Sequence, residues 1–87
     1  MLKISEDKKD ERSMTLRLEG RVAGPWAGEL LQVVDQLLAD ETNLALDLAE
    51  VSFADESGVA LLSRLKLQGV ELLNTNPFVA EQLKVGD

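Results

Sequence analysis

The sequence contains no cysteine, no histidine and no tyrosine among its 87 residues. Without cysteine it forms no disulfide and has no thiol chemistry. The three missing side chains include the commonest general bases, nucleophiles and zinc ligands of enzymes. We therefore expect a protein that is not an enzyme and that needs neither a metal nor a cofactor.

Long apolar runs are also missing. The N-terminal stretch MLKISEDKKDERS is too polar for a signal peptide or a membrane span, so we expect a cytoplasmic protein without direct membrane insertion. No Walker-type phosphate loop is present, because Gly58 stands alone and no Gly-Lys-Ser follows it. The net charge of −7 argues against nucleic acid and anionic membranes, and a basic or neutral protein partner fits better.

What the sequence does have is enough apolar character for one small globular domain. Hydrophobic residues make up 45% of the chain, and both charge signs are interspersed. The pattern predicts a short strand over Leu2–Ile4, a solvated hairpin loop over Glu6–Arg12, and a half-buried strand from Met14 that Gly20 ends. Pro25 then opens an amphipathic helix that reaches about Asp40.

In the second half of the sequence, predicted strands and helices also follow one another in turn. Leu44–Leu48 alternates as a strand, and Asp55 opens a helix that is closed by a left-handed cap at Gly69. We expect this helix to bury Val59, Leu62 and Leu65, and to expose Ser63, Arg64 and Lys66. Val70–Leu73 is a short strand, and Asn76-Pro77 caps a last helix with Phe78, Val79 and Leu83 on its buried side.

The predicted order is β-β-α-β-α-β-α, which defines an α/β fold. Two successive β-α-β units imply parallel strands, and the initial hairpin adds an antiparallel edge strand. The strands alternate and are not continuously apolar, so we expect a mixed sheet with the helices mostly on one face. Trp26 has helical register with Leu30 and Val33; it either anchors a partner or belongs to the core.

The most informative segment is Phe53-Ala54-Asp55-Glu56-Ser57-Gly58-Val59-Ala60-Leu61-Leu62, where a strand meets an acidic turn and a helix. Ser57 sits where the helix begins, and free backbone N–H groups at a helix start favour a phosphate. One interpretation is a phosphorylatable switch. The other is that Asp55 and Ser57 simply cap the helix.

Four carboxylates surround the same turn: Asp47, Glu50, Asp55 and Glu56. Carboxylates and water are the ligands that Mg²⁺ prefers, so a magnesium site is one hypothesis. The alternative is that Asp47 lies on the outward face of its strand and the other three are loop or cap residues. We favour this second interpretation and predict no metal site.

The stretch from Leu44 to Gly58, LALDLAEVSFADESG, resembles the central motif of the STAS family, which includes the bacterial anti-sigma factor antagonists. The family's apolar strand with Leu-Asp-Leu, its short linker with an aromatic, its Asp-x-Ser/Thr-Gly turn and its amphipathic helix are matched in order. The motif covers roughly the middle quarter of the chain. The resemblance implies a single STAS-like domain over residues 1–87.

The resemblance implies that the Ser or Thr directly before the glycine is phosphorylated by a partner that is both a serine kinase and an anti-sigma factor. In this sequence that residue is Ser57. We therefore expect a regulatory module in a partner-switching pathway of signal transduction and transcription regulation. The expected partner-binding residues are Asp55, Glu56, Ser57, Gly58 and Arg64. Glu56 stands where the family often has a second Ser or Thr.

The sequence departs from the family pattern in three respects. Ala23 replaces an acidic residue that commonly follows the second strand, and Val59-Ala60 replaces a frequent Leu-Gly. The sequence ends at Asp87, where the family usually continues into another strand and a helix, so we expect either a shortened domain or a last element contributed by another subunit. The resulting exposed strand Val70–Leu73 predicts a weak homodimer or an obligate partner.

A second functional class remains open. A domain of this fold can serve as a structural subunit that docks on a larger complex, such as the ATPase of a lipid transporter, without being phosphorylated. The fixed negative charge of Glu56 favours that alternative.

Overall fold

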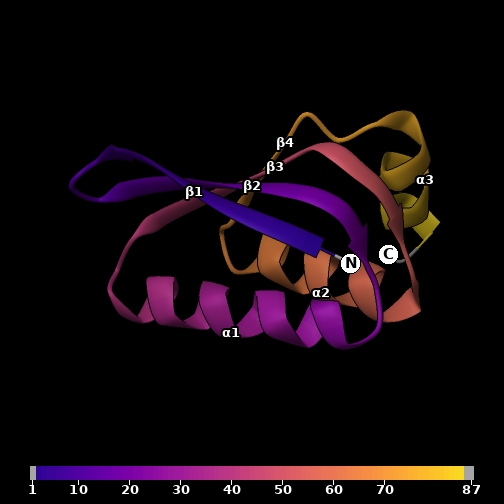
Figure 1. Ribbon diagram of the computed structural model, residues 1–87, viewed down its shortest axis with the longest axis horizontal. Helices are drawn as coiled ribbons and strands as arrows, with labels where there is room; N and C mark the ends of the chain where they lie inside the picture. Colours follow the sequence, from indigo (N-terminus) through magenta and orange to yellow (C-terminus); the bar gives the residue numbers. More distant parts are fainter. Residues whose placement is uncertain (1, 86–87) are drawn as a thin grey trace.

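The computed structural model describes residues 2–85, which form one mixed sheet and three helices (Figure 1). The elements follow the predicted order: β1 (Leu2–Asp10), β2 (Ser13–Val22), α1 (Pro25–Ala39), β3 (Asn43–Ala54), α2 (Glu56–Leu67), β4 (Glu71–Leu73) and α3 (Pro77–Val85). The predicted α/β class is confirmed.

The strands lie in the sheet in the same order as in the chain, β1-β2-β3-β4. β1 pairs with β2 antiparallel, whereas the pairs β2–β3 and β3–β4 are parallel, as the two β-α-β units predict. Helices α1 and α2 lie along one face of the sheet, and α3 packs beside the end of β3 (Figure 1). The other face of the sheet carries no helix among the described residues.

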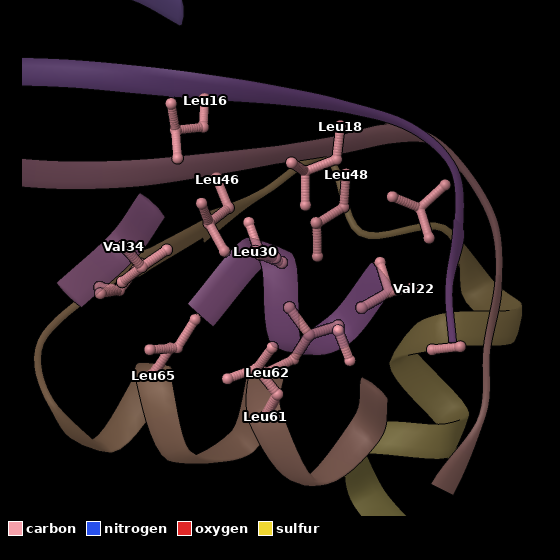
Figure 2. Close-up of a cluster of buried hydrophobic side chains, with 14 of the residues drawn as sticks. Leu16, Leu18, Val22, Leu30, Val34, Leu46, Leu48, Leu61, Leu62 and Leu65 are labelled. Atoms are coloured by element: carbon pink, nitrogen blue, oxygen red, sulfur yellow. The ribbon is translucent and has the colours of Figure 1, made fainter. Parts of the chain in front are cut away.

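The core lies between this helical layer and the sheet. Alternate side chains of β2 and β3 point towards the helices and meet apolar side chains of α1 and α2 (Figure 2). The largest fully buried side chains of these four elements are Leu16, Leu18, Val22, Leu30, Val34, Leu46, Leu48, Val51, Leu62 and Leu65. Each such side chain stabilises the fold by about 1.5–3 kcal/mol relative to an exposed position.

Three strands are longer than the hydrophobic pattern predicts. The segment expected as a loop belongs largely to β1, since only Glu11 and Arg12 form the turn of the hairpin. Gly20 does not end β2; with φ of 111° it lies inside the strand, beside a shift of register, and pairing continues to Val22. β3 likewise runs on to Ala54. In β1, backbone pairing extends the strand beyond the residues that contact the core, whereas the extensions of β2 and β3 include the buried residues Val22, Val51 and Ala54.

The helices follow the prediction closely. α2 buries Leu61 in addition to Leu62 and Leu65, while Val59 is only half-buried. Trp26 packs partly buried against the core, which supports its structural interpretation. At the start of α3, the Asn76 Oδ1 accepts a hydrogen bond from the Val79 N–H at 2.8 Å, so the predicted cap is confirmed.

The buried side of α3 is confirmed in part. Val79 is fully buried and Leu83 packs against the core. The predicted burial of Phe78 lies outside the described side chains. Asn76 Nδ2 also donates to the Val51 carbonyl at 2.7 Å, and Gln82 Nε2 donates to the Ala54 carbonyl at 2.9 Å. These two bonds hold α3 against the end of β3.

Candidate functional site at the start of α2

The turn between β3 and α2 is held by the carboxylate of Asp55. Its Oδ1 accepts from the Gly58 N–H at 2.8 Å and caps α2, as the sequence predicts. Its Oδ2 accepts from the Gly24 N–H at 2.9 Å, immediately before α1. These two bonds, from Gly58 first and from Gly24 second, lower the pKa of Asp55 below its ordinary value. One side chain thus joins the starts of both helices.

Gly58 is required by its surroundings. It is buried against the end of β2, where an added Cβ would lie 1.9 Å from the carbonyl oxygen of Val22. The same carbonyl accepts from the Asp55 N–H at 3.2 Å. Asp55 and Gly58 together therefore fix the first turn of α2 against β2, and both have a structural role.

Glu56 and Ser57, between these two residues, are exposed. Ser57 is the second residue of α2, and none of the hydrogen bonds among residues 2–85 involves its hydroxyl. The cap interpretation is thus right for Asp55 and wrong for Ser57. The fold accounts for two residues of the motif and leaves Glu56 and Ser57 facing solvent.

Ser57 lies on a shallow groove between α1 and α2, with a volume of about 230 Å³. Its floor is apolar and formed largely by small side chains, and its lining residues are Ala27, Gly28, Leu31, Ser57, Ala60, Leu61 and Arg64. Arg64 follows Ser57 by seven residues, so both lie on the same face of α2. Among the described side chains, Arg64 takes part in no ion pair.

Of the five residues predicted to bind a partner, Ser57 and Arg64 line the groove and Glu56 is exposed beside it. The contribution of α1 was not predicted. It comes from Ala27, Gly28 and Leu31, which lie some thirty residues away in the sequence. The small side chains of Ala27 and Gly28, where the helical pattern allows larger ones, were the available signal.

The structure does not gather the four carboxylates of the magnesium hypothesis into one cluster. Within residues 2–85, no three Asp or Glu side chains are placed to share a metal ion. Asp47 instead accepts from the Ala49 N–H at 3.0 Å and from Asn74 Nδ2 at 3.1 Å. These bonds, the backbone one first, lower the pKa of Asp47. Its flanking residues Leu46 and Leu48 are buried, so Asp47 lies on the outward face.

The fold and the turn define a small α/β domain that presents an exposed serine at a helix start. A family model described as Mlab, STAS domain, matches residues 5–87. The chain belongs to the STAS domain family.

Two solved structures are similar to this chain. The anti-sigma factor antagonist SpoIIAA in its unphosphorylated form matches with a TM-score of 0.78 and 18% identity, over 97% of this chain and 80% of its own. The protein Mglu matches with a TM-score of 0.64 and 23% identity, over 84% of this chain and 19% of its own. Both matches establish the fold. A search of curated protein sequences finds no match.

None of the helices in residues 2–85 combines the length and the apolar character that a membrane-crossing helix needs.

Proposed function

We propose that this chain is a regulatory protein-binding module that docks its partner on the groove between α1 and α2 and is switched by phosphorylation of Ser57. The observation that carries the proposal is the exposed hydroxyl of Ser57 at the edge of an apolar groove. The module acts by binding and not by catalysis.

The geometry of the turn supports this assignment. Asp55 and Gly58 hold the first turn of α2 in place, so a change at Ser57 alters the surface without loosening the fold. A phosphate there adds about two negative charges. The partial positive charge at the N-terminus of α2 tolerates it in the isolated domain, whereas a partner on the groove would be repelled.

The partner proposed for this surface resembles an anti-sigma factor with serine kinase activity. This proposal rests on the family and on the motif that includes Ser57. Such a partner would bind the unmodified domain, phosphorylate Ser57 and then dissociate. The protein would thereby act in transcription regulation in the cytoplasm of a bacterium.

The first experiment is a pull-down from native cell extract, followed by mass spectrometry of the bound protein and of phosphate on Ser57. Titration calorimetry then measures binding of the recovered partner. We expect Ser57→Asp to weaken binding at least about tenfold, equivalent to ~1.4 kcal/mol, and Ser57→Ala to unfold at the same urea concentration as the wild type.

Ser13→Asp is the matched control, because it introduces the same charge in the hairpin formed by β1 and β2, away from α2 (Figure 1). It should bind with wild-type affinity. Wild-type affinity of the Ser57→Asp variant would contradict the switch.

A second candidate is a structural subunit that docks constitutively on a larger complex, such as a transporter ATPase. Glu56 favours it, because an exposed negative charge already stands beside Ser57 at the start of α2. A partner that accepts this charge would respond less to a second one. This candidate predicts no phosphate on Ser57 and an unchanged affinity of the Ser57→Asp variant.

A further inference from the structure

A second groove lies on the side of α2 away from the candidate site. It has a volume of about 950 Å³ and is bounded by the end of α2, by β4 and by α3. Its lining is mostly apolar and consists of Ser63, Lys66, Leu67, Gly69, Val70, Glu71, Leu72, Thr75, Ala80 and Leu83. Among the described side chains, the exposed large hydrophobic ones are Leu67, at 90%, and Phe53, at 38%.

The groove follows an open edge of the sheet. β4 is the last strand in the sheet order, and no other strand within residues 2–85 pairs with its outer edge. Proteins commonly cover such an edge or pair it with another chain. Because β4 has only three residues, it offers few backbone groups, and side chains must supply most of any contact here.

The charges beside the groove are balanced, unlike those of the whole chain. Lys66 supplies one positive charge and Glu71 one negative charge, and neither forms an ion pair with the described side chains. In a two-fold dimer, a contact between one residue of the first copy and another residue of the second copy occurs twice, with the roles of the copies exchanged. A surface with one cation and one anion is then complementary to itself, despite the net charge of −7.

We propose that the occupant of this groove is a second copy of the chain. In the two-fold dimer, Leu67 of each copy enters the groove of the other, and Lys66 of each copy faces Glu71 of its partner. The dimer is weak, because the groove and the short edge form a small interface. It leaves the groove between α1 and α2 free, so this proposal does not depend on the proposed function.

Sedimentation velocity from micromolar to millimolar concentration tests the proposal. The wild type should change from monomer to dimer across this range. Leu67→Glu should raise the dissociation constant at least about a hundredfold, because two leucine side chains lose their buried positions. Leu67→Ala should weaken the dimer as well, which separates lost apolar contact from added charge. Both variants should fold, since Leu67 is exposed.

A charge-exchange experiment tests the two-fold geometry. Lys66→Glu and Glu71→Lys should each weaken self-association by about tenfold, because both ion pairs of the dimer become repulsive. An equimolar mixture of the two variants should form a heterodimer, since both contacts are then between opposite charges. Lys8→Glu, which makes the same charge change in the hairpin, should dimerise like the wild type.

Two results would overturn the proposal. One is a wild-type protein that stays monomeric at millimolar concentration, which would mean that the groove is vacant or belongs to a different partner. The other is a dimer that Leu67→Glu leaves intact, or variants of opposite charge that fail to associate when mixed. That result would place the interface on a different face of the molecule.

Discussion

At the scale of single residues, the residues of the turn before α2 have different roles. Asp55 bridges two helix starts through Gly24 and Gly58, and Gly58 provides the space that the Val22 carbonyl needs. Ser57 performs none of these tasks and keeps its hydroxyl on the surface. A motif that looks like one functional unit in the sequence therefore contains two structural residues around an exposed pair.

Gly58→Ala should destabilise the protein by about 2–4 kcal/mol, because its Cβ would overlap the backbone of β2. Gly28→Ala is the matched control: Gly28 lies inside α1 and nothing approaches its missing Cβ within 4 Å. It should stabilise by about 0.5–1 kcal/mol. Urea unfolding followed by circular dichroism measures both. Equal stability of the two variants would contradict the close approach at Gly58.

At the scale of elements, one ionised carboxylate, that of Asp55, joins the starts of α1 and α2. Asp55 is stabilised in its charged form by two N–H donors, which lowers its pKa in the folded protein below the ordinary value of 3.8. The unfolded chain lacks these donors and takes up the proton first as the pH falls. The stabilisation is thus complete above the ordinary pKa and is lost as the pH falls through the lower, folded pKa.

We therefore expect the urea midpoint to fall as the pH is lowered from about 6 to about 2. Asp55→Asn should unfold at lower urea at neutral pH, and its midpoint should depend less on pH, because the ionised acceptor is gone. Asp47→Asn removes a second carboxylate with a lowered pKa and separates the two contributions. The same pH dependence of the urea midpoint in the wild type and in Asp55→Asn would contradict this account.

At the scale of the whole molecule, the acidic groups are dispersed and no cluster of them within residues 2–85 is suited to a metal. We expect millimolar Mg²⁺ to leave the melting temperature nearly unchanged. A site filled at about a hundred times its dissociation constant would add ~2.7 kcal/mol, a shift of about 10 °C or more for a small domain. Differential scanning calorimetry with equal ionic strength from NaCl as the control decides this, and such a shift would restore the metal site.

The order of elements was predictable because the core side chains alternate in strands and recur every three or four residues in helices. The ends of the strands were not predictable, because Glu6–Lys8 of β1 and Phe53 of β3 are paired through their backbones while their side chains are exposed and give no hydrophobic pattern. The cap of α2 by Asp55 was predictable from local sequence. The bond to Gly24 and the contact of Gly58 with Val22 join distant segments and needed the fold.

The sheet order has a consequence for how the chain folds during synthesis. Each strand is placed beside the one made just before it, so no later strand has to insert between two earlier ones. As the chain leaves the ribosome, the hairpin of β1 and β2 can form first, and each helix-and-strand unit can then dock on a finished edge. Within residues 2–85, the three-residue β4 is the last strand added, so the edge that forms last in this sheet is also its shortest.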